Sequence, residues 1–300
     1  MKVLKYIFLS IIIVFSSCRK VPDEDGSSTT NLFDDNNHGV FEFNDYQPLA
    51  DKPFNIHFYL PTSVDRTNAP ILFIFPGMNR NADDYLETWI PLAEQYSIMV
   101  FSFEFSDYYY PNSTSYQLGY VRDFNNNFTN EDIWTFSLIE PVFDRIKNDL
   151  DYLGNQYNMF GHSAGAQFVH RYVQFKPNSR INKAVSANAG WYTLPDTSIS
   201  FPYGLKGTSI NSNDLESSFL KNLEIHLGQN DNNPNDPFLN TTDGANLQGN
   251  HRLSRGQYFI LKSDSIAQTM NFNSNWIKKE VPNVGHQQVN MAAFAAQELF

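Results

Sequence analysis

One segment sets the interpretation of the whole chain: Tyr157-Asn158-Met159-Phe160-Gly161-His162-Ser163-Ala164-Gly165-Ala166-Gln167-Phe168-Val169. It begins with an apolar run typical of a buried strand and ends in residues of helical character. Between them, Gly161-x-Ser163-x-Gly165 puts small residues on both sides of a sharp turn, which exposes the Ser163 hydroxyl beside the free N–H groups of a helix start. The pattern predicts a serine nucleophile whose reaction passes through an oxyanion. A glycine-rich turn without chemistry is the alternative.

Apolar strands and amphipathic helices alternate around this segment. Buried strands are predicted at residues 71–75 and 98–103, and a strand exposed on one side at 54–60. Helices are predicted over residues 83–96, from Pro141 to Leu150, between Ser163 and Pro177, and over 287–299. Further strands are predicted at residues 184–187, 223–227 and 276–281. This alternation predicts an α/β domain with a doubly wound, mostly parallel sheet and helices on both faces.

Two later strands are each followed by a residue that could complete a catalytic site. Asp231 follows residues 223–227, and His286 follows residues 276–281. Ligands bind at the carboxyl ends of parallel strands, so these residues and Ser163 are expected to meet there. His286 would act as general base, and Asp231 would orient its imidazole.

Both partners have rivals that also lie in loops. His251 competes with His286, and Asp236 competes with Asp231. The run of residues 231–236, with Asp at both ends, could also suggest a calcium loop, but Asp236 and Thr242 stand where an EF-hand needs Gly and Glu. We therefore expect no metal and no cofactor.

The oxyanion hole needs two backbone donors. One is predicted to be the N–H of Ala164, directly after the nucleophile. The other is predicted to come from the loop after residues 71–75, which reads Pro76-Gly77-Met78-Asn79. Met78 is the preferred donor, with Asn79 as the alternative, because Pro76 stands where lipases usually have His.

These motifs together resemble a known family. The chain resembles α/β-hydrolases of the polyhydroxybutyrate depolymerase and feruloyl esterase-like group. The resemblance is carried by residues 76–83, 161–168, 188–192, 228–231 and 284–286. Related bacterial hydrolases also carry versions of Gln248-Gly249-Asn250-His251-Arg252. The resemblance implies an α/β-hydrolase fold and a serine hydrolase that acts on ester bonds. A non-catalytic ligand-binding protein or a serine peptidase on the same fold are the alternatives, since the fold hosts many functions.

The N-terminus predicts export. Residues 1–17 combine two lysines with an apolar run, as a signal peptide does, and Phe15-Ser16-Ser17-Cys18 resembles a bacterial lipobox. We expect lipidation at Cys18, a flexible tether over residues 18–38, a hydrolase domain over residues 39–300, and a location at the outer membrane or cell surface.

Composition limits the partners. The net charge of −11 makes nucleic acid an unsuitable partner, and leaves a small-molecule or polymer ester as the expected substrate. The aromatic-rich residues 191–218 are predicted either to cap the site or merely to cover the core. Residues 107–111 are expected to line the same cleft.

Overall fold

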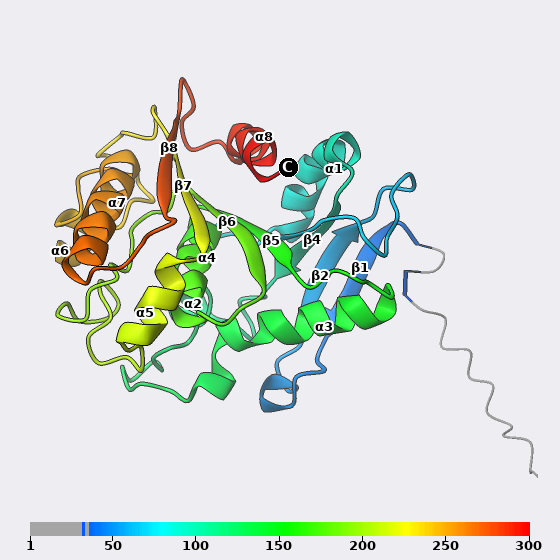
Figure 1. Cartoon of the computed structure of the whole chain (residues 1–300), viewed down its shortest axis with the longest axis horizontal. Coiled ribbons are helices and arrows are strands. Elements are labelled where there is room, and N and C mark those ends of the chain that lie inside the picture. The colour runs from blue at the N-terminus through cyan, green and yellow to red at the C-terminus, as the bar shows by residue number, and fades with distance from the viewer. Residues whose placement is uncertain (1–31, 34–35) are drawn as a thin grey trace, which may run out of the picture. The chain divides into compact units, whose positions relative to one another are not determined.

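The computed structural model describes residues 32–33 and 36–300, which form one eight-stranded sheet with the order β1-β2-β4-β3-β5-β6-β7-β8 (Figure 1). The β1–β2 and β2–β4 pairs are antiparallel, and the other five pairs are parallel. The strands are β1 (His38–Phe43), β2 (Phe54–Tyr59), β3 (Ile71–Phe75), β4 (Met99–Glu104), β5 (Tyr157–His162), β6 (Ile181–Ala187), β7 (Asn222–Gly228) and β8 (Ile277–Val281). The predicted doubly wound, mostly parallel sheet is confirmed.

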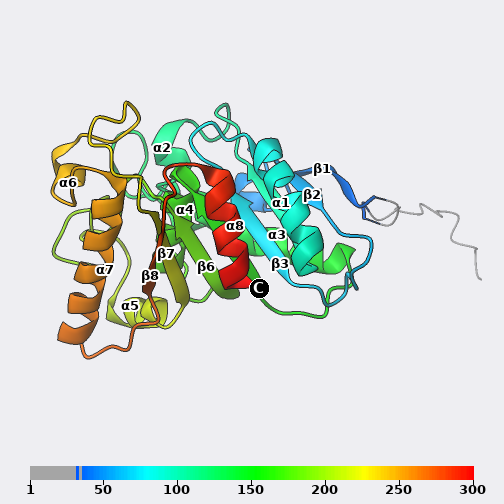
Figure 2. The same ribbon diagram turned by 90° about the horizontal axis from the view of Figure 1, so that it is seen from above.

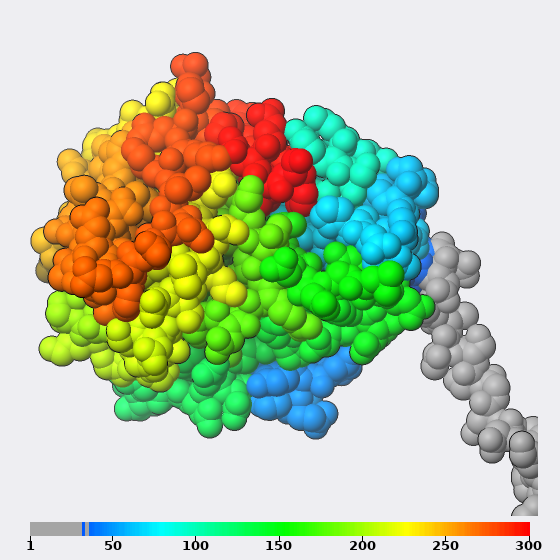
Figure 3. All heavy atoms as spheres, viewed as in Figure 1, coloured from blue at the N-terminus to red at the C-terminus, as the bar shows by residue number. Residues whose placement is uncertain are grey.

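Helices cover both faces of the sheet (Figure 2). The longer ones are α1 (Ala82–Tyr96), α3 (Ile139–Asp149), α4 (Ala164–Phe175), α5 (Ser212–Phe219), α7 (Arg252–Thr269) and α8 (Gln288–Leu299); the short ones are α2 (Asn112–Ser115) and α6 (Asp243–Asn246). Helices α1 and α8 pack on one face, and α3, α4, α5 and α7 pack on the other. Although far apart in the chain, α1 and α8 lie side by side (Figure 3), joined by a 2.7 Å hydrogen bond from Gln288 to Thr88.

Strand β3 shows why its apolar run produces this layered core. Ile71, Phe73 and Phe75 point into the layer shared with α4, whereas Leu72 and Ile74 point into the layer under α1 and α8. All five side chains are fully buried. A strand covered on both faces needs apolar residues at every position, which is the pattern that the sequence shows. Burial of each such side chain contributes about 1.5–3 kcal/mol.

The domain begins before the predicted boundary. Phe33 is 2% exposed and its ring lies 4.9 Å from the ring of Phe58, in an edge-to-face contact. Strand β1 then starts at His38, within the segment predicted as tether. The prediction of a tether up to residue 38 is therefore wrong at its C-terminal end, because an aromatic anchor precedes the first strand. The predicted signal peptide and Cys18 lie outside the described residues.

Four of the α-helices in the described residues are not among those predicted. They are the short α2 and α6, α5 at the end of the segment 191–218, and α7 after the loop of residues 229–251. Along the described part of the chain, no helix is both long and apolar enough to cross a membrane.

Candidate active site

The nucleophile segment forms a sharp turn between β5 and α4. Ser163 has φ 57° and ψ −111°, a backbone conformation that residues other than glycine rarely adopt. The positions on both sides of Ser163 need glycine, because the surrounding backbone leaves no room there for a side chain. A Cβ at Gly161 would lie 2.2 Å from the carbonyl oxygen of Gly165, and a Cβ at Gly165 would lie 1.8 Å from that of Phe75. The two glycines therefore hold Ser163 in place by close backbone contact.

The structure brings the three predicted residues together at the carboxyl ends of β5, β7 and β8. Ser163 Oγ lies 3.1 Å from His286 Nε2, and His286 Nδ1 lies 2.7 Å from Asp231 Oδ2. The Asp231 side chain is 5% exposed, while that of His286 is 29% exposed. With Nδ1–H donating to the carboxylate, Nε2 is free to accept the serine proton.

The rival residues do other work. His251 caps α7, because its Nδ1 accepts a hydrogen bond from the Ser254 N–H at 3.1 Å. Asp236 pairs with Arg252 at 2.9 Å. Within residues 32–33 and 36–300, no three His, Cys, Asp or Glu side chains are grouped to hold a metal ion.

Asn188, at the end of β6, links the loop that carries Asp231 to the loop that carries His286. Its amide donates to the Gly285 carbonyl at 2.9 Å, and its side-chain oxygen accepts from the Gly228 N–H at 2.8 Å. Gly228 begins the loop to Asp231, and Gly285 directly precedes His286. Asn188 is 1% exposed, so both hydrogen bonds are shielded from water. Sequence reasoning included Asn188 in a family motif but gave it no role.

The loop expected to complete the oxyanion hole is firmly anchored. The buried Arg80 guanidinium donates to the carbonyls of Phe105 and Tyr110, each at 2.7 Å. The Tyr116 hydroxyl donates to the Pro76 carbonyl, also at 2.7 Å. These bonds fix the backbone of residues 76–80 beside the start of α4. Ala164 is the first residue of that helix, so its N–H has no intrahelical acceptor. Met78 and Asn79 both line the cleft, so both stay candidates for the second donor.

His162, the residue before Ser163, lies beside the site. Its ring centroid is 4.8 Å from that of His286, and its Nδ1 is 2.8 Å from the Tyr85 hydroxyl. Burial, reinforced by the nearby His286 and Arg252, lowers the pKa of His162 well below its ordinary value. His162 is therefore neutral at physiological pH and packs against the ring of His286.

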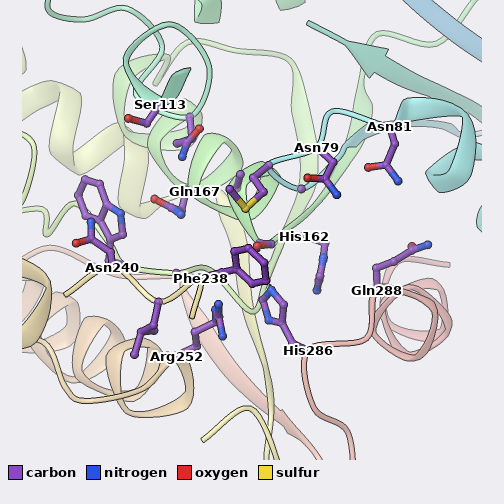
Figure 4. A pocket seen from close by; sticks show the side chains of 18 of the residues that line it. Asn79, Asn81, Ser113, His162, Gln167, Phe238, Asn240, Arg252, His286 and Gln288 are labelled. Carbon is purple, nitrogen blue, oxygen red and sulfur yellow. Dashed lines mark hydrogen bonds between the residues drawn. The ribbon is translucent and has the colours of Figure 1, made fainter. Parts of the chain in front are cut away.

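A cleft of about 790 Å³ opens over Ser163 (Figure 4). Trp191 and Phe238 give it aromatic surface, and Phe238 stands in front of His286 in the close-up. The remaining polar surface consists mainly of side-chain amides, from Asn79, Asn81, Gln117, Gln167, Asn240 and Gln288. The size is that of a pocket for a small molecule or one segment of a polymer.

The two segments expected near the cleft behave differently. In residues 191–218, Trp191 lines the cleft, whereas Tyr192 and Phe201 are buried in the core. This segment therefore mostly covers the core and contributes one aromatic wall. Residues 107–111 do not line the cleft: Asp107 pairs with Arg80, and Tyr108 is 84% exposed.

The fold and the geometry of the site together indicate a class of protein. A nucleophile turn, a hydrogen-bonded Ser-His-Asp set and a mostly parallel sheet define an α/β-hydrolase-type serine hydrolase. A poly(aspartic acid) hydrolase-1 from Sphingomonas sp. KT-1 is 36% identical, with 87% of this chain and 97% of that chain covered and a TM-score of 0.83. A poly(3-hydroxybutyrate) depolymerase, LpqC from Bordetella parapertussis, is 30% identical over 88% of this chain and 89% of that chain, with a TM-score of 0.84.

The chain belongs to the α/β-hydrolase family, in its polyhydroxybutyrate depolymerase-like group. The prediction of a serine hydrolase is confirmed by this membership. An S-formylglutathione hydrolase from Agrobacterium tumefaciens shares the fold at 13% identity and a TM-score of 0.57. No protein-family profile and no curated protein sequence matches the chain.

Proposed function

We propose that the protein is a carboxylic ester hydrolase that uses Ser163, His286 and Asp231 as its catalytic triad. The observation that carries this proposal is the continuous hydrogen-bonded line from Ser163 Oγ through His286 to Asp231, at 3.1 and 2.7 Å. These distances are within the range for proton transfer between a serine and its base.

The reaction follows from this line. Ser163 Oγ attacks the ester carbonyl while His286 Nε2 takes its proton, and the buried Asp231 carboxylate stabilises the imidazolium. His286 then gives the proton to the departing alcohol oxygen, which leaves an acyl group on Ser163. Water attacks that acyl group, loses its proton to His286, and releases the acid while Ser163 recovers its proton. The N–H of Ala164, with that of Met78 or Asn79, would stabilise the oxyanion formed in both steps.

The charge of the cleft favours an uncharged substrate. Of the described residues that line it, only Arg252 and Asp84 are permanently charged. Arg252 is not available to a substrate, because its guanidinium is 4% exposed and pairs with Asp231 and Asp236. A polymer that carries a carboxylate on every unit would meet the Asp84 carboxylate here, without an available cation among the described lining residues to bind it. Neutral esters of an aliphatic or hydroxylated compound fit the aromatic and amide surfaces better.

Amide hydrolysis is the second candidate. It is favoured by the 36% identity to a poly(aspartic acid) hydrolase, since amide bonds join the units of that polymer. The same triad can cleave amides, but the paired Arg252 argues against this polymer as the substrate here.

A substrate panel decides between these candidates. The panel would contain p-nitrophenyl esters of increasing chain length, acetylated and feruloylated sugars, poly(3-hydroxybutyrate) and poly(aspartic acid). We expect hydrolysis of neutral esters with kcat/KM far above that for poly(aspartic acid). Preferential release of aspartate oligomers, with weak ester hydrolysis, would contradict the proposal.

We further propose that the enzyme is exported and anchored by lipid, with palmitate among the acyl chains on Cys18. The support is the signal-like segment followed by the lipobox-like Phe15-Ser16-Ser17-Cys18. Cys18→Ala should release the protein from the membrane fraction, because lipid attachment is the proposed anchor. Equal membrane retention of the variant and the wild type would reject this part of the proposal.

A further inference from the structure

The motif Gln248-Gly249-Asn250-His251-Arg252 has no place in the triad, yet it lies against it. His251 caps α7, and Arg252 is the first residue of that helix. The helix start is thereby held against the loop that carries Asp231, whose carbonyl accepts the Leu253 N–H at 3.1 Å. Arg252 is the residue of the motif that reaches the triad acid.

Arg252 joins two carboxylates within a buried site. Its Nη1 lies 3.3 Å from Asp231 Oδ1, on the carboxylate whose other oxygen binds His286. The same guanidinium binds Asp236 with two nitrogens, at 2.9 and 3.2 Å. The hydrogen bond from Arg252 lowers the pKa of Asp236, so Asp236 is charged at neutral pH. Asp231 is therefore one member of a longer series of hydrogen-bonded side chains, Asp236–Arg252–Asp231–His286.

The charges along this chain oppose one another. The cation on Arg252 offsets part of the negative charge that Asp231 presents to the imidazolium of His286. The carboxylate of Asp236 in turn offsets part of the cation. Removing Arg252 should therefore favour protonated His286, and removing the charge of Asp236 should disfavour it. Because the side chains of Arg252 and Asp231 are 4% and 5% exposed, solvent screens their interaction only weakly.

We propose that Arg252 and Asp236 are positioning residues that act on His286 through Asp231, with opposite effects on the charge of the base. This inference rests on the proposed function, since it assumes that His286 is the general base. It assigns a role to Arg252, which sequence analysis placed only within a family motif, and to Asp236, which it weighed only as a rival acid.

The other titratable groups around the triad do not produce this pattern. They come from β5, α1, the segment after β6 and the cleft rim, and are His162, Tyr85, Tyr192 and Asp84. Burial raises the pKa of both tyrosines, which therefore stay neutral, and burial lowers the pKa of His162 well below its ordinary value, which disfavours its charged form. All four groups are unchanged in the variants that test the proposal.

The test is the pH profile of kcat/KM for a p-nitrophenyl ester, measured from pH 5 to 9. In Arg252→Met the acid limb should move to higher pH by about half to one unit, and in Asp236→Asn it should move to lower pH by about half a unit. Arg252→Lys keeps the charge and should bring the limb back toward the wild-type position. Asp243→Asn, which removes an exposed carboxylate in α6, is the matched control and should leave the limb unmoved.

The outcomes separate the two proposals. Limbs that stay in place, or move in the same direction, in Arg252→Met and Asp236→Asn would overturn the role proposed here. If Arg252→Met does not fold, the direction of the shift in Asp236→Asn decides alone, because Asp236 is partly exposed and its removal disturbs less. Ser163→Ala is measured in the same assay: activity that survives it would overturn the proposed function instead.

Discussion

The nucleophile turn and the loop of residues 229–251 lie at the same edge of the sheet but are held in different ways. Around Ser163, the geometry comes from close backbone contacts of Gly161 and Gly165, with β3 as the neighbour. The loop that carries Asp231 is held by polar side chains, namely Asn188 from the end of β6 and Arg252 and Arg255 from α7, the helix that follows the loop. The nucleophile is thus encoded by a short local motif, whereas its partners are positioned by scattered hydrogen bonds.

The largest expected effect tests whether the two regions form one catalytic unit. Ser163→Ala and His286→Ala should each lower kcat by about 10⁴-fold or more, with Asp231→Asn somewhat less severe. His251→Ala is the matched histidine control. It should lower the thermal midpoint through loss of a helix cap, worth about 1 kcal/mol, and keep near-normal turnover. Near-normal turnover in His286→Ala, with activity lost in His251→Ala, would show that His251 and not His286 is the general base.

The second prediction tests the backbone packing of the turn. Gly165→Ala should destabilise the protein by about 3 kcal/mol or more, because the new Cβ would lie 1.8 Å from the Phe75 carbonyl oxygen. Gly190→Ala is the comparison, since its Cβ would meet only the flexible end of Gln167, at 3.0 Å. Urea unfolding of both variants measures the difference. Equal stability of the two would show that close backbone contact does not hold the turn.

The third prediction tests the polar links of the partner loops. Asn188→Ala leaves the Gly228 N–H and the Gly285 carbonyl without their partner, which should cost about 2–4 kcal/mol. It should also lower kcat, because the loops to Asp231 and His286 lose their shared tie. Asn182→Ala, on the exposed part of the same strand, should change the free energy of unfolding by less than about 1 kcal/mol. Unchanged kcat in Asn188→Ala would show that the two hydrogen bonds of Asn188 are not needed for catalysis.

The smallest expected effect for a single residue is a loss of stability in mild acid. Burial lowers the pKa of His162, His170 and His226 in the folded protein. The unfolded chain therefore binds protons more strongly, so the contribution of these residues is complete above about pH 6.5 and is lost as the pH falls. Each histidine should remove at most on the order of 1 kcal/mol per pH unit below 6.5, and His226 the least, because its hydrogen bond to Glu224 opposes the effect of burial. Urea unfolding at pH 7.5, 6.5 and 5.5 measures this loss, and stability that holds or rises toward pH 5.5 would contradict it.

Much of the fold could be predicted because apolar runs such as residues 71–75 report directly on burial. Helix α7 was missed for a physical reason: its buried face includes Arg252, Arg255 and Ser263, so the apolar period is broken. Strand β1 was missed because the preceding Asp- and Asn-rich residues hide a short alternating strand.

The meeting of Ser163, His286 and Asp231 could be predicted from the order of residues after strands, since parallel strands bring their carboxyl ends to one edge. The roles of Asn188 and Arg252 could not, because they depend on which way a side chain points once distant loops have met. For the same reason the sequence does not reveal that His226 is fully buried beside Glu224.

Labelling with a serine-reactive fluorophosphonate probe, followed by mass spectrometry of the modified peptide, tests the central claim most directly. The account predicts a single adduct on Ser163, formed rapidly in the wild type, slowly in His286→Ala and not at all in Ser163→Ala. An unlabelled wild type, or a label on another residue that persists in Ser163→Ala, would contradict the triad and leave a hydrolase fold without this catalytic serine.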